Sequence, residues 1–82
     1  MKYVVVKIKG KEEIFPFPRT INHDRFCEVL SFIKHGSDRD WSREYAQPVS
    51  AGFIDNGKCH GRSETLNLDS RGELDDILLR GN

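Results

Sequence analysis

Two cysteines and three histidines are the side chains of this 82-residue sequence best suited to metal or nucleophilic chemistry. His23 and Cys27 have the spacing of one helix face, and Cys59 directly precedes His60. Together these four residues offer the sulfur and nitrogen ligands that zinc prefers. Adjacent strand residues, however, point to opposite faces, so Cys59 and His60 do not readily chelate one ion. No C-x-x-C or H-x-x-x-H pair occurs. We therefore predict no metal site and no cofactor.

The same two thiols could also form a disulfide or supply a nucleophile. A Cys27–Cys59 disulfide is sterically conceivable between a helix and a sheet, but a cytoplasmic location disfavours it. A cysteine nucleophile needs a polar cleft, whereas Cys59 shares its predicted strand face with small, uncharged residues. We expect two free thiols.

Other patterns typical of enzymes are missing from the sequence. The scattered glycines match neither a phosphate-binding loop nor a dinucleotide fingerprint. The paired acids Glu12-Glu13 and Asp75-Asp76 are chain neighbours whose side chains diverge, and acid–base catalysis needs convergent groups. A chain of 82 residues also has little room for an enclosed pocket. We expect no catalytic residue, no small-molecule ligand and no enzyme activity.

Basic and aromatic side chains on the predicted strands form the remaining candidate site. On one open sheet face they would suit phosphates and stacked bases, provided that both predicted hairpins share that face. The alternative is that Phe53 points into the core while His60 and Arg62 only border it. The candidate interaction surface comprises Lys7, Lys9, Phe53, Lys58, His60 and Arg62.

The first elements that position these residues are a predicted hairpin. Residues 2–9 are rich in β-branched and aromatic types, which favours a strand, and Glu12–Phe17 is the predicted partner. Pro16 and Pro18 cannot donate to a strand ladder, so the partner should lie at a sheet edge.

The spacing of apolar residues then predicts a helix over His23–His35. Asn22 suits its N-cap and Gly36 suits its left-handed C-terminal stop. The apolar stripe expected to face the core comprises Phe26, Val29, Leu30 and Ile33.

The segment from Ser37 to Gln47 has no clear period, and Pro48 closes it. Trp41 and Tyr45 have the spacing of one helical turn, and an irregular loop that folds both rings onto the core fits equally well.

A second hairpin follows, because Asn56-Gly57 favours a two-residue type I′ turn. It predicts a strand over Val49–Asp55 and its partner over Lys58–Glu64. Leu66 and Leu68 either prolong that partner or cross to the core.

The turn fixes the register of this hairpin. Phe53 should face His60, and Gly52 should face Gly61. Because opposed glycines indicate the close approach of another backbone, we expect a helix on the glycine face and none over Phe53.

The chain is predicted to end in a short helix. Ser70 and Glu73 have the spacing of a capping box at its start. Asp75 and Asp76 suit the positive end of its dipole. Leu74, Ile77 and Leu78 form the stripe expected to face the core.

The predicted order is strand, strand, helix, strand, strand, helix. We therefore expect one α+β domain over residues 1–82. It should be a small two-layer domain in which two helices cover one face of a mainly antiparallel sheet made of two hairpins.

Composition excludes several classes of protein. Hydrophobic residues make up 37% and charged residues 32% of the chain, which fits neither a disordered tail nor a membrane protein. The 13 basic and 13 acidic residues give zero net charge, which disfavours general attraction to nucleic acid. No apolar run approaches the roughly 20 residues that span a bilayer, and the N-terminus lacks a signal-peptide pattern. We expect a soluble cytoplasmic protein without a membrane partner.

Residues 49–80 also carry a family resemblance. The stretches 49–53, 59–66 and 69–71 resemble small uncharacterised proteins of bacteria and their phages. The resemblance brings no catalytic or binding residue with it. It implies a small accessory α+β protein.

Two functions compete on these observations. The favoured one is a non-enzymatic interaction or accessory module, of phage or prophage type, whose partner is another protein. The alternative is a nucleic-acid-binding module that uses the basic, aromatic sheet face. Zero net charge favours the first.

Overall fold

The computed structural model describes the backbone of residues 1–35 and 46–81 and the side chains of residues 1–29 and 47–81. Predictions for Gly36, Trp41 and Tyr45 lie outside these residues. The α+β class is confirmed, and two short strands are added after the second hairpin. In chain order the elements are β1 (Lys2–Ile8), β2 (Lys11–Phe17), α1 (His23–His35), β3 (Ala46–Asp55), β4 (Lys58–His60), β5 (Arg62–Ser63), β6 (Leu68–Asp69) and α2 (Glu73–Gly81).

The main sheet is antiparallel and has the strand order β2-β1-β3-β4. β1 lies inside it, and its residues Tyr3 to Val6 are fully buried. β2 lies at one edge, as Pro16 within it and Pro18 just after it predict, and Pro16 pairs with Tyr3. Both predicted hairpins are therefore present, and the pairing of β1 with β3 joins them into one sheet.

β3 begins earlier than predicted and includes Pro48 instead of following it. Val5 pairs with Ser50 and Val6 pairs with Pro48, so Val49 is the extra residue of a bulge. β4 pairs only with the end of β3 from Phe53 onward, which leaves Pro48 on a stretch of β3 that β4 does not reach. Proline is tolerated there because no ladder bond needs its missing N–H.

The partner strand of the second hairpin is shorter than predicted. The predicted register holds for Phe53 opposite His60, but the strand ends at His60 and does not continue to Glu64. Gly61 follows with φ +83°, a left-handed conformation that turns the chain away. β5 then pairs with β6, and Gly52 has no glycine opposite it.

The close approach expected at Gly52 is present, but a strand makes it. A Cβ at Gly52 would lie 2.3 Å from the carbonyl oxygen of His60 and 3.2 Å from Cβ of Ser70. Only glycine allows the backbone of β4 and the segment before α2 to lie so near.

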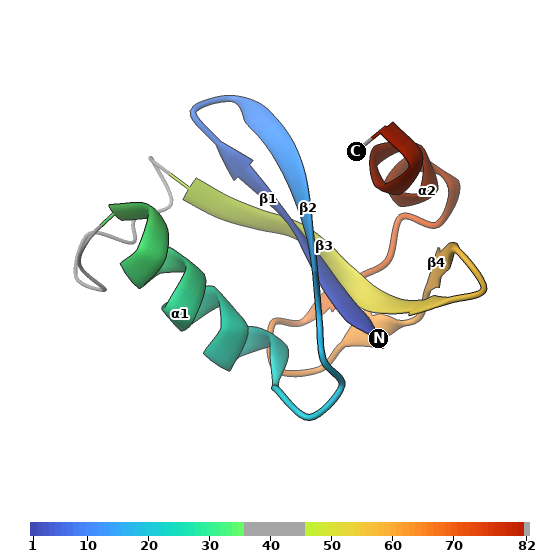
Figure 1. Ribbon diagram of the computed structural model, residues 1–82, viewed down its shortest axis with the longest axis horizontal. Helices are drawn as coiled ribbons and strands as arrows, with labels where there is room; N and C mark the ends of the chain where they lie inside the picture. Colours follow the sequence, from blue (N-terminus) through green and yellow to red (C-terminus); the bar gives the residue numbers. More distant parts are fainter. Residues whose placement is uncertain (36–45, 82) are drawn as a thin grey trace.

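The helices lie on opposite faces of the sheet, so the two-layer arrangement with both helices on one face is wrong (Figure 1). One core cluster joins Val4 and Val6 to Cys27 of α1. The other joins Tyr3 and Val5 to the α2 residues Leu78 and Leu79. The run of consecutive apolar residues in β1 is typical of a strand buried on both faces.

The predicted stripe of α1 is confirmed at Phe26 and is wrong at Val29, while the side chains of Leu30 and Ile33 lie outside the described residues. Cys27 is buried, Phe26 packs beside it, and His23 is also buried. Val29, by contrast, is 49% exposed. Leu66 and Leu68 pack against the same cluster, so they cross to the core instead of prolonging β4.

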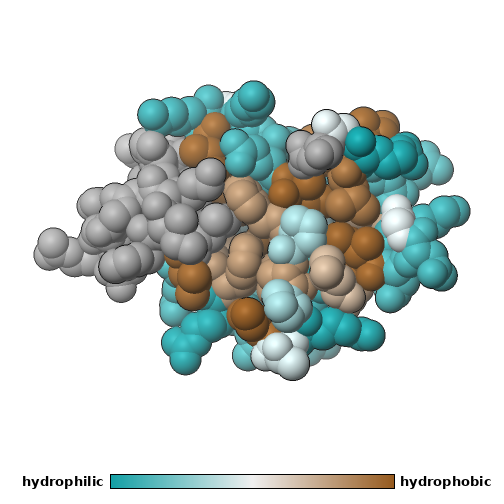
Figure 2. Space-filling view, viewed as in Figure 1, coloured by the Kyte–Doolittle hydropathy of each residue, from teal (hydrophilic) through white to brown (hydrophobic). Residues whose placement is uncertain are grey.

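α2 packs through Leu78, as hydrophobic periodicity predicts, but the rest of its packed face differs from the prediction. Its carboxylates Asp75 and Asp76 are buried, whereas Leu74 and Ile77 are each 59% exposed. Figure 2 shows apolar residues at the surface over the sheet and beside α2, bordered by hydrophilic ones. Of the two described helices, neither has the length and apolar character needed to cross a bilayer.

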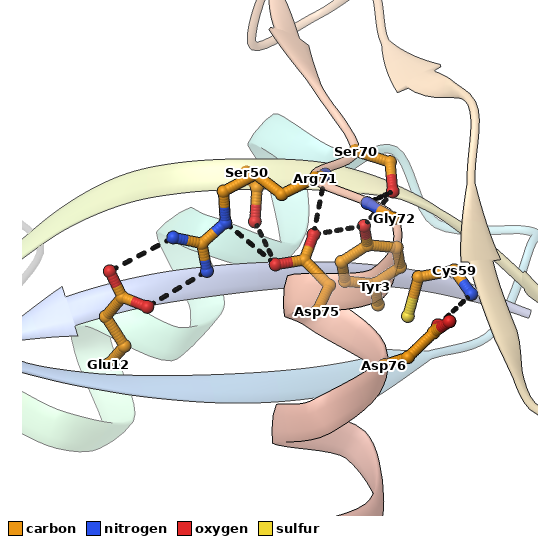
Figure 3. A network of polar contacts seen from close by, with 9 residues as sticks. All are labelled: Tyr3, Glu12, Ser50, Cys59, Ser70, Arg71, Gly72, Asp75 and Asp76. Atoms are coloured by element: carbon orange, nitrogen blue, oxygen red, sulfur yellow. Dashed lines mark hydrogen bonds and ion pairs between the residues drawn. The ribbon is translucent and has the colours of Figure 1, made fainter.

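A network of polar contacts attaches α2 to the sheet (Figure 3). The fully buried Asp75 carboxylate accepts hydrogen bonds from the Tyr3 hydroxyl at 2.5 Å and the Ser50 hydroxyl at 3.0 Å. Arg71 donates to it from the backbone N–H at 3.0 Å and from Nε at 2.9 Å. Burial alone would raise the pKa of Asp75, but these donors outweigh burial and hold that pKa below its usual value.

The network continues from Arg71 to the first hairpin. Both terminal nitrogens of Arg71 donate to the two carboxylate oxygens of Glu12 in β2, at 2.9 and 3.1 Å. The hydrogen bonds from Arg71 lower the pKa of Glu12. Two-point pairing of this kind fixes the orientation of the two side chains as well as their distance. Through Asp75 and Arg71, one network of hydrogen bonds connects α2 with β1, β2 and β3.

The start of α2 is capped differently from the predicted box. Ser70 Oγ accepts from the N–H of Gly72 at 3.0 Å. The carboxylate that reaches back to the N–H of Arg71 belongs to Asp75, while Glu73 is exposed. Asp76 instead accepts from the N–H of Cys59 at 2.6 Å, so the two neighbouring acids diverge as expected.

Candidate binding groove

An open groove of about 650 Å³ lies at one end of the sheet, on the face that α1 covers. Strands β1, β3 and β4, the N-terminal end of α1 and the β5 region all contribute to its walls. We call this feature the groove. Its lining residues are Lys2, Arg19, Asn22, His23, Phe53, His60, Gly61, Arg62, Ser63, Glu64 and Thr65.

Strand pairing brings residues that are far apart in the sequence together in the groove. Lys2 pairs directly with Phe53 across β1 and β3, and Phe53 pairs with His60 across β3 and β4. Arg19 lies in the turn between β2 and α1. The groove therefore depends on the order of three adjacent strands.

The Phe53 ring forms the aromatic part of the lining and is partly exposed. It meets the buried ring of His23 edge-on at 6.0 Å and the ring of His60 at 6.1 Å between centroids. Gly61 also packs on it, because a Cβ there would lie 3.0 Å from Cδ2 of Phe53. A side chain at this position would be pushed against the ring, so the glycine keeps this part of the groove open.

Three cations line the groove together with this ring. The guanidinium carbon of Arg19 lies 5.7 Å from the centroid of Phe53, within the range of a cation–π contact. Lys2 Nζ donates to the carbonyl of Ile21 at 3.1 Å, which uses one of its three protons. Arg62 donates to Asn67 Oδ1 at 2.7 Å and lies 3.7 Å from a carboxylate oxygen of Asp69.

The two histidines of the groove differ in their surroundings. His23 Nε2 lies 3.0 Å from the carbonyl oxygen of Gly52, and burial lowers the pKa of this histidine, which favours the neutral ring. His60 is exposed and lies 2.6 Å from a carboxylate oxygen of Asp55. That contact lowers the pKa of Asp55.

The structure brings together half of the predicted interaction surface. Phe53, His60 and Arg62 line the groove. Lys58 is exposed opposite Asp55 but does not line it. Lys7 and Lys9 lie toward the far end of β1, with Lys7 about 16 Å along the strand from Lys2. The nucleic-acid alternative requires one open face shared by both hairpins, and this condition is not met, because a helix packs against each face.

The four residues considered as zinc ligands do not converge. Cys27 belongs to the core cluster on the α1 face, whereas Cys59 belongs to the cluster on the α2 face. The sheet therefore separates these two free thiols. Burial raises the pKa of each to about 12, which disfavours the thiolate that nucleophilic attack and metal binding require. Within the described ranges, no three His, Cys, Asp or Glu side chains gather as metal ligands.

Sequence reasoning missed Lys2, Arg19 and His23 as neighbours of Phe53. The hairpin turn at Asn56-Gly57 predicts the contact of Phe53 with His60. By contrast, Lys2 reaches Phe53 only because β1 pairs with β3, and strand order is a long-range property. Arg19 carries no local signal beyond its position in a turn.

The chain matches no family model, no curated protein and no solved structure. The resemblance to small bacterial and phage proteins therefore stays a prediction. The groove has to be interpreted through its own chemistry.

Proposed function

We propose that the protein is a non-enzymatic interaction module that binds a short acidic segment of a partner protein in the groove. One observation carries the proposal. Lys2, Arg19 and Arg62 line the groove beside a partly exposed aromatic ring, and the only acid among the described lining residues is Glu64. An occupant with negative charge and an apolar group complements such a surface.

The size of the groove supports a short segment as occupant. A volume of about 650 Å³ accommodates a few side chains of an extended peptide. The binding mode would be recognition of an acidic motif by clustered cations. Arg19 makes no ion pair with any described residue, and its described contact is the one with the Phe53 ring.

The same surroundings support a binding role over catalysis. A histidine base needs a nucleophile within hydrogen-bond reach. His60 is paired with Asp55, and His23 faces a backbone carbonyl. In the described part of the chain, no hydroxyl or thiol is hydrogen-bonded to either ring.

A fluorescence-anisotropy titration tests the proposal. The probe is a short labelled peptide of alternating glutamate and leucine, and the matched control peptide has glutamine in place of glutamate. We expect binding of the glutamate peptide only, weakening as salt rises because the charges are exposed and therefore screened. Arg19→Gln should weaken binding, whereas Arg25→Gln should not, because Arg25 lies on α1 outside the groove and pairs with Glu28.

Two results would count against this function. Equal affinity for the glutamate and glutamine peptides would remove the role of charge. Tighter binding of a labelled oligothymidylate, lost with Phe53→Ala, would favour the nucleic-acid alternative, in which bases stack on the exposed ring.

A further inference from the structure

We infer that α2 is the contact surface for a second copy of this chain, and that the two α2 helices pack antiparallel about a twofold axis. The inference depends on the apolar stripe on the outer side of α2 and on the opposite charges at its two ends. It goes beyond the proposed function, because α2 packs on the face of the sheet opposite to α1 and the groove (Figure 1).

The outer side of α2 is apolar because carboxylates fix its inner side. Asp75 and Asp76 are buried and accept hydrogen bonds from the sheet. Helical periodicity then turns Leu74 and Ile77 toward solvent, where each is 59% exposed, with the partly exposed Leu78 beside them. In the described part of the chain, Leu74 and Ile77 belong to neither core cluster. Large apolar side chains that lie together at the surface are typical of an interaction site.

The charges that border this stripe are arranged for self-pairing. Glu73 lies in the first turn of α2 and Arg80 in its last turn, and neither forms an ion pair with another described residue. They are seven residues apart, which places them on the same side of the helix, about 10 Å apart along its axis. An antiparallel arrangement therefore brings the Arg80 of each copy beside the Glu73 of the other. A parallel arrangement would oppose like charges at both ends.

The apolar residues match in the same arrangement. The midpoint of the span from Glu73 to Arg80 falls next to Ile77, so the twofold axis passes close to this residue. The Ile77 side chains of the two copies then meet near the axis, and Leu74 of each copy packs beside them. Such a contact is isologous, because the same surface is used by both copies. Both grooves stay open in this dimer, because they lie on the other face of each sheet.

The small size of α2 limits the strength of the dimer. The helix has nine residues and is about 13 Å long, so a pair of such helices buries less than about 1,200 Å² of surface, the range of weak and transient contacts. We therefore expect a dissociation constant between about 10 μM and 1 mM and a monomer at lower concentrations.

Sedimentation equilibrium at increasing protein concentration measures the dimer. Ile77→Gln should weaken dimerisation about tenfold or more, because it places a polar group at the centre of the contact. The matched control is Val29→Gln, which changes an apolar side chain of α1 that is 49% exposed and should leave the dissociation constant unchanged. Circular dichroism should show that both variants stay folded.

Exchange of the end charges tests the occupant and the orientation together. Glu73→Arg leaves positive charge at both ends of the helix, and Arg80→Glu leaves negative charge at both ends. Each variant alone should therefore dimerise about tenfold more weakly in low-salt buffer. An equimolar mixture of the two variants should recover the affinity of the natural chain, because opposite charges face each other again. The double variant that carries both substitutions should recover it for the same reason.

Each of the other results would overturn the inference. A monomer at about 1 mM would mean that a second copy does not occupy the stripe. An unchanged dissociation constant in Ile77→Gln would place the contact elsewhere. Single charge variants that dimerise as well as the natural chain would exclude the antiparallel orientation, and a mixture that recovers no affinity would show that Glu73 and Arg80 do not pair between copies.

Discussion

Replacing Asp75 by asparagine should lower the free energy of unfolding more than any other single change of charge in α2. The substitution keeps the shape of the side chain but removes its charge and converts one acceptor oxygen into an NH₂ donor. Asp75 is fully buried and accepts from Tyr3, Ser50 and Arg71. At least one of these donors would then face another donor, and Arg71 would lose a carboxylate partner.

The expected size of the loss follows from the burial of this contact. Removing one partner of a buried ion pair costs about 3–5 kcal/mol, because the remaining polar groups stay desolvated. A domain of 82 residues has a total stability of about 4–12 kcal/mol. We therefore expect Asp75→Asn to remove about a quarter or more of the free energy of unfolding and to lower Tm by at least about 12 °C.

Urea unfolding followed by far-UV circular dichroism measures the effect. The matched control is Glu73→Gln, which also removes one charge from the first turn of α2 but from an exposed side chain. It should cost less than about 1 kcal/mol, the usual size of a helix-dipole contribution. Tyr3→Phe removes only one donor to Asp75 and should cost about 1.5–3 kcal/mol, which gives a milder variant if Asp75→Asn does not fold.

The same network predicts a pH dependence. Asp75 and Glu12 both have folded-state pKa values below their usual ones, so the unfolded chain binds more protons as pH falls past about 4. Their contribution is complete above that range and is lost as pH falls through the folded values. Asp75→Asn should show a shallower loss of stability at acidic pH. Equal urea midpoints for Asp75→Asn and Glu73→Gln would refute the reasoning.

Two further predictions concern other parts of the fold. Gly52→Ala should lower the free energy of unfolding by about 3 kcal/mol, since the new Cβ would lie 2.3 Å from a backbone oxygen. The control is Gly81→Ala, which has open space around the new Cβ and should leave the urea midpoint unchanged or slightly raised. His23 has a pKa lowered by burial, so the unfolded chain takes up a proton first as pH falls from about 7 to 5, and stability should fall over that range. His23→Gln should flatten this part of the profile, and an unchanged slope would exclude His23 as its source.

Local sequence signals predicted most of the elements but not the face through which each helix packs. The bounds of α1 and the register after Asn56-Gly57 follow from capping and turn preferences of neighbouring residues. The orientation of α2 does not. Periodicity places Leu74 and Ile77 inward because it counts apolar side chains, but both are exposed and Asp75 is buried.

The reason is that the partners that allow Asp75 to be buried are far away in the chain. Tyr3 lies 72 residues from it and Ser50 lies 25 residues from it. A buried carboxylate is tolerated only when its acceptors are satisfied. No pattern within α2 reports on donors in β1 and β3. The same limit applies to the groove, where Lys2 meets Phe53 only through the pairing of β1 with β3.

The alternation of β1 separates the candidate binding residues from the contacts that hold α2. Lys2 and Tyr3 are neighbours, yet Lys2 lines the groove on the α1 face while Tyr3 donates to Asp75 on the α2 face. Arg19 and Phe53 belong with Lys2, and neither contributes to the Asp75 network. Side chains on opposite faces of the sheet are connected only through the backbone between them. Substitutions of exposed groove residues can therefore alter ligand binding without weakening the contacts between α2 and the sheet. A loss of peptide binding in Arg19→Gln with an unchanged urea midpoint therefore reports on recognition, whereas Tyr3→Phe reports on stability.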